Sequence, residues 1–411
     1  MNKIIKSQIN KLRPSATLAI NEECNKLKKS GKKVFKFGFG QSPFPIPDSV
    51  IMALKNHANK NNYLPMQGLE ELRSSIANHL NLNNNNNFKS EDVVIGPGTK
   101  ELMFLTQLAF SGEILLPAPS WVSYQPQALI AKNKVHWIQA NSSNNWFPTA
   151  DQLEKKIKSI RKKNLLFFLN SPNNPSGTVC KNLKEIAEVA KKYKLIVLSD
   201  EIYSQLTFDN NYKSISNFYP EGTIVSSGLS KWCGAGGWRL GFFAIPSKLK
   251  EFRNSLKILC SESFTSVSAP VQYAAIEAYK GDHKIYLDGV KKILSFIGNY
   301  VYENLKSNSI NVIKPEGGFY LFPEFRNAKF STSSKMCKDI LNKTGVALLP
   351  GSDFGLNKKI MLARLSYTDF EGSTFLNNTL GSKKLDNEDL KKYAPNIVDG
   401  VVKLKEWSNS L

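Results

Sequence analysis

Long apolar runs are missing from this sequence. No uninterrupted stretch approaches the roughly 18 residues that a membrane-spanning helix needs. The basic N-terminus, MNKIIKSQINKLRPS, also lacks the apolar core and the small-residue cleavage site of a secretory signal. We therefore expect a cytoplasmic protein without a membrane partner. Its 411 residues, 41% of them hydrophobic, suffice for two or three domains with sizeable cores.

Cysteine and histidine are scarce and scattered. The five cysteines are odd in number and far apart, and no two of them have the CxxC spacing of a zinc or redox site. This pattern argues against a disulfide framework and favours reduced thiols in a reducing compartment. Because the four histidines are equally dispersed, no metal site is predicted. These residues are Cys24, Cys180, Cys233, Cys260 and Cys337, with His57, His79, His136 and His283.

Acidic residues are few relative to basic ones. The chain has 34 Asp and Glu against 55 Lys and Arg, a formal net charge of +21. Such a balance can indicate a nucleic-acid partner. Here, however, the basic residues are dispersed in pairs such as Lys28-Lys29 and Lys391-Lys392, without a basic tail or an interleaved stripe of aromatic residues. We therefore predict no nucleic-acid partner.

Short apolar segments alternate with helix-length segments through the middle of the chain. Several of them carry hydrophobic residues on both faces, as strands buried on two sides do. This alternation predicts an α/β fold in which helices cover both faces of a mostly parallel sheet and ligands bind at the carboxyl ends of the strands. The strand candidates are 92–95, 113–116, 134–138, 164–170, 195–200, 223–227 and 240–245, and the helix candidates are 100–110, 183–192 and 248–260.

The two ends of the chain have a different pattern. The last third suggests a smaller α+β unit, and the first 45 residues combine one helix candidate with one extended segment. We expect three parts: residues 1–45, a large domain over 46–285 and a small domain over 286–411. The segments concerned are helices at 16–27, 283–304 and 396–407 and extended segments at 34–39, 311–313, 317–322 and 361–366, with a loop over the asparagine run 83–87.

Four polar motifs follow predicted strands. Residues 96–100, Gly-Pro-Gly-Thr-Lys, open a helix, and their glycines and free N–H groups favour an anion such as phosphate. Residues 170–177, Asn-Ser-Pro-Asn-Asn-Pro-Ser-Gly, form a rigid loop that can aim an amide at a ligand. Asp200 ends a buried strand, where an acid is costly unless it is paired. Lys231 lies in a glycine-rich stretch, eight positions before Arg239. Taken singly, these motifs also fit a plain turn, a common loop, a helix cap and a solvated lysine.

In this order, the four motifs resemble those of the class I aminotransferases, enzymes that use pyridoxal 5′-phosphate (PLP). The resemblance extends from about residue 13 to residue 367. It is specific because many separate positions agree in order and spacing. Further matches indicate the bacterial aspartate-aminotransferase-like branch: PSATLA at 14–19, GQSPFP at 40–45, YLPMQGL at 63–69, PGSDFG at 350–355 and ARLSY at 363–367.

This resemblance implies a fold and an activity. The fold is that of the PLP-dependent transferases, with a mostly parallel seven-stranded sheet flanked by helices in the large domain. Residues 1–45 would form an N-terminal arm and part of the small α+β domain. The implied activity is amino-group transfer (EC 2.6.1.-) between an amino acid and a 2-oxo acid, in a homodimer with shared active sites.

The resemblance also assigns roles around the PLP ring. Lys231 would bind the PLP aldehyde covalently and then move the α-proton, since a lysine with a lowered pKa can do both. Asp200 would keep the pyridine nitrogen protonated. Tyr203 and Asn174 would bond the ring 3′-oxygen, and Trp121 would stack on the ring.

A second group of residues would hold the phosphate and the substrate. Gly98, Thr99 and Lys100 would bind the phosphate with Ser227 and Arg239, and Tyr63 would reach the phosphate of the other subunit. Arg364 would bind the substrate α-carboxylate through two N–H groups, aided by Asn174, Trp121 and the backbone near Gly40. The substrate side chain has no arginine assigned to it. The residues suggested for that pocket are Ser15, Thr17 and Tyr124.

One position and two short stretches depart from the family pattern. Gly228 stands where many relatives have a serine, so Ser226, Ser227 or Ser230 could take over its phosphate contact. The stretches at 40–44 and 234–237 also differ, which puts the substrate pocket in doubt. Aspartate is the favoured donor and 2-oxoglutarate the favoured acceptor, with alanine and aromatic donors left open.

Two other readings stay open beside the aminotransferase. A PLP-dependent carbon–sulfur β-lyase or another PLP lyase would share the same lysine, aspartate and arginine. A PLP-sensing transcription regulator would use the positive charge. Such a regulator needs a DNA-binding domain ahead of the matched region, and that region begins near Arg13.

Overall fold

The computed structural model describes residues 4–10, 12, 16–83, 86–379 and 384–411. Its centre is a seven-stranded sheet in the order β1-β7-β6-β5-β4-β2-β3. Strand β7 is antiparallel to both of its neighbours, and all other pairs are parallel. The strands are β1 (Val93–Gly96), β2 (Glu113–Ala118), β3 (Val135–Gln139), β4 (Leu165–Asn170), β5 (Ile196–Asp200), β6 (Thr223–Gly228) and β7 (Gly241–Ala244). The predicted α/β fold with a mostly parallel sheet is thus confirmed.

Helices cover both faces of this sheet because its central strands are apolar on both sides. In β4, Phe167 packs with the cluster that includes Ile186 of one face, and Phe168 packs with the cluster that includes Leu102 and Leu256 of the other. The helices of this part are α2 (Asp48–Asn56), α3 (Glu70–Asn83), α4 (Thr99–Ala109), α5 (Tyr124–Ile130), α6 (Ala150–Lys158), α7 (Leu183–Lys192), α8 (Lys250–Phe264) and α9 (Ala269–Lys280).

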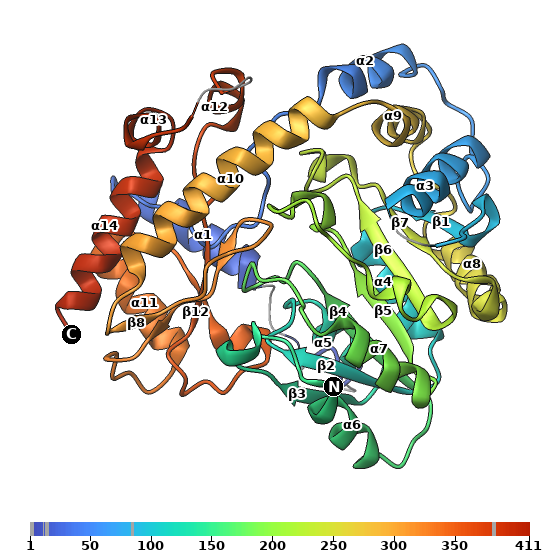
Figure 1. Ribbon diagram of the computed structural model, residues 1–411, viewed down its shortest axis with the longest axis horizontal. Helices are drawn as coiled ribbons and strands as arrows, with labels where there is room; N and C mark the ends of the chain where they lie inside the picture. The colour runs from blue at the N-terminus through green and yellow to red at the C-terminus, as the bar shows by residue number, and fades with distance from the viewer. Residues whose placement is uncertain (1–3, 11, 13–15, 84–85, 380–383) are drawn as a thin grey trace.

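A second region lies beside the sheet at the left of Figure 1, reached by the long helix α10 (Lys284–Leu305). It contains a three-stranded sheet, β11-β12-β9, and a two-stranded one, β10-β8. Its elements are β8 (Ile310–Asn311), β9 (Tyr320–Leu321), β10 (Glu324–Phe325), α11 (Ser333–Thr344), β11 (Leu349–Pro350), β12 (Ala363–Ser366), α12 (Gly372–Asn377), α13 (Asn387–Tyr393) and α14 (Pro395–Asn409).

The N-terminal segment packs against this C-terminal region. Helix α1 (Ala16–Lys29) lies among the orange and red elements of Figure 1. The predicted extended segment at 34–39 is not a strand; only Phe35 forms a bridge, with Val346, while the backbone N–H of Ser366 donates to the Phe37 carbonyl at 2.7 Å. These contacts support the proposed grouping of residues 1–45 with the small domain. The loop predicted at 83–87 includes residues 84–85, outside the described part of the chain.

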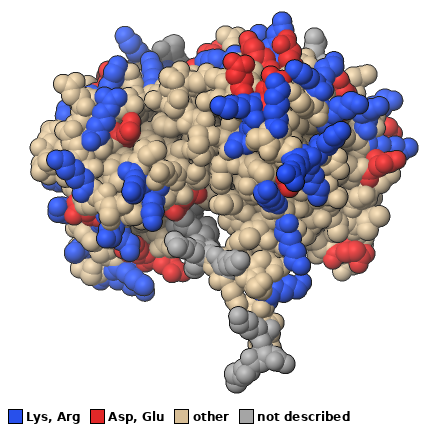
Figure 2. Space-filling model, turned by 90° about the horizontal axis from the view of Figure 1, so that it is seen from below, with Lys and Arg blue, Asp and Glu red and all other residues tan. Residues whose placement is uncertain are grey.

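The face of the molecule seen in Figure 2 carries charges of both signs. Figure 2 shows Lys and Arg side chains spread over both halves of one face, with acidic side chains between them. Within the described ranges, no helix is both long and apolar enough to cross a membrane.

Candidate active site

A cavity of about 730 Å³ opens at the carboxyl ends of the central strands. The sheet register places Asn170 and Asp200, the last residues of β4 and β5, beside Ser226 of β6, two residues before that strand ends. The opposite wall comes from β9, β12 and the N-terminal segment, which brings distant parts of the chain together. The cavity is lined by Gly40, Gln41, Thr99, Lys100, Trp121, Val122, Ser123, Asn170, Asn174, Asp200, Ile202, Tyr203, Ser230, Lys231, Gly236, Gly237, Arg239, Tyr320 and Arg364.

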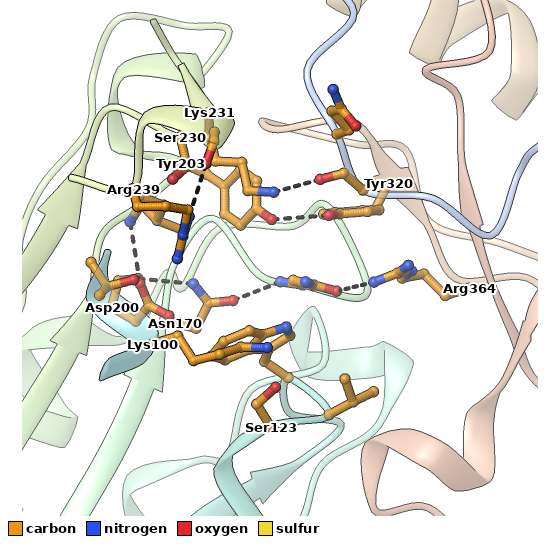
Figure 3. Close-up of a pocket in the computed structure, with 18 of the residues that line it drawn as sticks. Lys100, Ser123, Asn170, Asp200, Tyr203, Ser230, Lys231, Arg239, Tyr320 and Arg364 are labelled. Atoms are coloured by element: carbon orange, nitrogen blue, oxygen red, sulfur yellow. Dashed lines mark hydrogen bonds between the residues drawn. The ribbon is translucent and has the colours of Figure 1, made fainter. Parts of the chain in front are cut away.

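Asp200 presents a buried carboxylate at one end of this cavity (Figure 3). Burial raises its pKa to about 6, and hydrogen bonds from Tyr124 Oη at 2.6 Å and the Ile202 N–H at 3.4 Å limit the rise. The carboxylate is therefore mostly ionised at neutral pH. Tyr124, suggested for the substrate side-chain pocket, is buried, and its bond orients the Asp200 carboxylate.

Lys231 faces the same cavity from the loop after β6. Its amine donates to the Gly40 carbonyl and lies 5.7 Å from the centre of the Tyr203 ring. Desolvation, with a smaller contribution from the positive charge of Arg364, lowers its pKa to about 8, although Asp200 opposes the shift. A lysine in this state has an appreciable neutral fraction near pH 7, as a nucleophile or a general base requires.

The start of α4 provides a positive corner. Gly98 precedes the helix with φ +86°, and a Cβ added there would lie 2.3 Å from Arg239 Nη2. Only glycine therefore lets the Arg239 guanidinium cross the turn, where it donates to the carbonyls of Pro97 at 3.3 Å and Gly236 at 2.9 Å. Lys100 Nζ lies 5.3 Å from the centre of the Trp121 ring. Two cations beside a helix N-terminus make a site for an anion.

Arg364 occupies the other end of the cavity, on β12. Its guanidinium is buried, donates to Asn174 Oδ1 at 3.0 Å and to the Gly38 carbonyl at 2.7 Å, and stacks 4.7 Å from the centre of the Tyr320 ring. Its Nε has no hydrogen-bond partner, and no acid forms an ion pair with it among the described residues. A buried cation with a free N–H edge is suited to binding a carboxylate ligand.

A chain of hydrogen bonds joins the two ends of the cavity. Asn170 Nδ2 donates to the Asp200 carbonyl at 2.9 Å, and Asn170 Oδ1 accepts the Asn174 N–H at 2.7 Å. Asn174 then accepts from Arg364, so the dashed lines of Figure 3 run from Asp200 through Asn170 to Arg364. The separation of these two ends is therefore fixed by the rigid loop after β4.

Most residues singled out in the sequence line this one cavity. The described ones that do not are Gly98, Tyr124 and Ser226, together with Ser227 and Tyr63. Ser227 donates to the Glu201 carbonyl at 3.3 Å and lines a second cavity, and Tyr63 is 90% exposed. Ser230 lines the main cavity in place of Ser227. Ser15 and the Thr17 side chain lie outside the described part of the structure. The residues that sequence reasoning assigned no role here are Gln41, Val122, Ser123, Asn170, Ile202, Gly236, Gly237 and Tyr320.

The donor set fits PLP. The cofactor needs an amine, a carboxylate for its ring nitrogen and an anion site for its phosphate. The cavity supplies the buried amine of Lys231, the ionised carboxylate of Asp200 and the positive corner of Thr99, Lys100 and Arg239. Arg364 is left over for a second anion.

Comparisons with known proteins agree with this fit. Residues 32–371 match the model of the family described as aminotransferase class I and II. An aspartate aminotransferase of Bacillus sp. (strain YM-2) is 30% identical over 383 residues, covering 89% of this chain and 95% of that protein. A probable aspartate/prephenate aminotransferase of Aquifex aeolicus is 32% identical over 372 residues, covering 86% and 92%.

Solved structures match over nearly the whole chain. An aspartate aminotransferase of Thermotoga maritima superposes with a TM-score of 0.82 at 26% identity, covering 98% of this chain and 100% of the other. That of Thermus thermophilus with maleate gives a TM-score of 0.86 at 23% identity, covering 98% and 99%, which shows the shared fold. The chain therefore belongs to the class I and II aminotransferases, enzymes of the type EC 2.6.1.- whose family uses PLP.

Proposed function

We propose that this protein is a PLP-dependent aminotransferase that moves an amino group from an L-amino acid, with aspartate favoured, to a 2-oxo acid such as 2-oxoglutarate. The observation that carries the proposal is the division of the cavity into two ends. One end pairs Lys231, whose pKa is lowered to about 8, with the buried carboxylate of Asp200. The other end holds Arg364 without an acidic partner among the described residues.

The residues around Lys231 and Asp200 would hold PLP. Thr99, at the start of α4, and Arg239 would bind its phosphate, and Tyr203 and Trp121 would face its ring. When bound, PLP supplies an electron-withdrawing ring that stabilises the negative charge left on the substrate α-carbon. The Asp200 carboxylate would hold a proton on the ring nitrogen.

The chain's own groups then divide the work on the substrate. Arg364 would bind the α-carboxylate through Nε and a second N–H, which burial shields from competing water. The Lys231 amine, once released, would take the α-proton at Nζ, because its lowered pKa suits a base near neutral pH. Donor and acceptor would use the same site in turn: the first leaves as a 2-oxo acid and its amino group stays on the enzyme for the second.

The preference for aspartate has its own support. Relatives at 30% and 32% identity are described as an aspartate and a probable aspartate/prephenate aminotransferase.

Assembly and location complete the proposal. Tyr63 presents an aromatic ring that is 90% exposed. This supports a homodimer in which Tyr63 reaches the neighbouring site, which light scattering on the purified protein tests. All five cysteines are free and buried, in keeping with a reducing compartment such as the cytoplasm.

The test of the proposed function is a count of product in the presence and absence of an acceptor. The PLP-loaded protein is mixed with aspartate alone, and then with aspartate and 2-oxoglutarate. We expect about one equivalent of 2-oxo acid per site without the acceptor and continuous turnover with it. Continuous turnover without an acceptor would indicate a lyase. No product from aspartate or any other amino acid, with PLP bound, would contradict the proposal.

A further inference from the structure

Tyr320 touches both ends of the cavity. It lies on β9, which pairs with the Arg364 strand β12, and it is only 1% exposed. Its hydroxyl lies 2.9 Å from Tyr203 Oη, and its ring lies face-on to the Arg364 guanidinium at 4.7 Å. In Figure 3, Tyr320 lies with Lys231 and Tyr203 on one side of it and Arg364 on the other. Among the described lining residues, no other has a hydrogen bond or ring contact with both Tyr203 and Arg364.

The backbone around Tyr320 is shaped to hold it. A Cβ added at Gly40 would lie 2.0 Å from the Tyr320 hydroxyl, and one added at Gly177 would lie 2.1 Å from its carbonyl oxygen. Both are closer than atoms can approach, so these two glycines leave the room that Tyr320 occupies. The Gly40 carbonyl also accepts a hydrogen bond from the Lys231 amine. The ring and hydroxyl of Tyr320 are therefore confined to one position.

The hydroxyl and the ring have separable effects. A phenol has one proton to donate and also accepts, so either hydroxyl can donate this bond. When Tyr320 donates it, the proton of Tyr203 is free to point into the cavity. Burial raises the pKa of Tyr203 well above its usual value, so that proton is present at working pH. A hydrogen bond received by a phenol also strengthens the bond that it donates. The Tyr320 ring, in contrast, stabilises the Arg364 cation by a cation–π contact.

We propose that Tyr320 is a positioning residue with two functions: its hydroxyl directs the Tyr203 proton toward the cofactor end, and its ring holds Arg364 in place for the substrate carboxylate. This inference rests on the proposed aminotransferase function. It assigns one side chain to two steps, cofactor tuning and carboxylate binding, which two substitutions separate.

The experiment compares Tyr320→Phe, which keeps the ring, with Tyr320→Leu, which loses both parts. The readouts are the dissociation constant of PLP from the apoprotein, the calorimetric affinity of the PLP-loaded protein for succinate, and the pH profile of kcat. Succinate has two carboxylates and no amino group, so it reports carboxylate binding without reaction. Tyr367→Phe is the matched control, because its buried hydroxyl donates to the Gly318 carbonyl at 3.3 Å and does not line the cavity.

The two variants should differ. For Tyr320→Phe we expect kcat to fall about 2- to 12-fold, as for one hydrogen bond, with a displaced pH profile and succinate affinity within twofold of the wild type. For Tyr320→Leu we expect succinate to bind about 5- to 30-fold more weakly as well, as for one desolvated cation–π contact. Tyr367→Phe should change none of these readouts.

Other results would overturn the inference. If Tyr320→Phe weakens succinate binding as much as Tyr320→Leu does, the ring has no separate function. If both variants match the wild type, or if the control reproduces their effects, Tyr320 serves packing alone. A wild-type protein that neither binds PLP nor transfers amino groups would instead refute the proposed function.

Discussion

The pKa of Lys231 makes the rate of PLP uptake by the apoprotein a sensitive function of pH. Only the neutral amine attacks an aldehyde. With a pKa of about 8, about 9% of Lys231 is neutral at pH 7, against about 0.03% for an ordinary lysine with a pKa of 10.5, an advantage of about 300-fold. The uptake rate should therefore rise about tenfold per pH unit below pH 8 and level off above it.

Stopped-flow absorbance of PLP mixed with the apoprotein measures this profile. Arg364→Met supplies a second perturbation, because the positive charge of Arg364 is the second largest cause of the lowered pKa after desolvation. The midpoint of the pH profile of PLP uptake should move to higher pH in Arg364→Met. A rate that continues to climb to pH 10 in the wild type would refute the reasoning, because Lys231 would then titrate as an exposed lysine. An unchanged midpoint in Arg364→Met would remove Arg364 from the explanation.

Three more substitutions have expected outcomes. Arg364→Lys keeps the charge but loses the two-pronged geometry, so KM for aspartate should rise about 10- to 150-fold in steady-state kinetics, as for a charge-assisted hydrogen bond of about 1.5–3 kcal/mol; an unchanged KM would exclude Arg364 from carboxylate binding. Gly98→Ala should weaken PLP binding at least about tenfold because its Cβ meets Arg239, whereas Gly31→Ala, with φ +79° and nothing within 4 Å, should only destabilise the fold slightly. Burial raises the pKa of Glu201 to about 7, so the folded state binds more protons than the unfolded state between about pH 4.5 and 7. The free energy of unfolding should therefore fall by up to about 3 kcal/mol as pH rises through this window. In denaturant titrations Glu201→Gln should lack that decline, and an equal decline in the variant would contradict the assignment.

The sheet could be predicted from the sequence because its strands are buried on both faces. Continuous apolar runs such as Leu165–Asn170 are bounded by polar turns, and each of the seven predicted strands overlaps an observed one. The prediction of an extended segment at 34–39 did not give a strand, because this segment does not pair along its length with a neighbouring strand. Its apolar residues, such as Phe37, pack into the core, and its backbone makes only isolated hydrogen bonds. The spacing of apolar residues in a sequence does not distinguish this arrangement from a strand paired in a sheet.

The site was predictable to the extent that its residues follow strand ends in recognisable motifs. Lys231 and Asp200 belong to such motifs, Arg364 belongs to the ARLSY match within β12, and the topology brings all three to one cavity. The bond from Tyr124 to Asp200 and the contacts of Tyr320 were not predicted, because they depend on which side chains face each other across the fold. Ser227, in β6, and Ser230, in the loop after it, are only three positions apart, and only the geometry shows which of them lines the cavity.

The most direct test of the central claim is to locate the lysine that carries PLP. The PLP-loaded protein is reduced with borohydride, digested, and its modified peptide sequenced by mass spectrometry. We predict that the phosphopyridoxyl group lies on Lys231 and that Lys231→Ala, with its circular dichroism spectrum compared with that of the wild type, retains none after reduction. A group found on another lysine, or on none of them, would contradict the account at its centre.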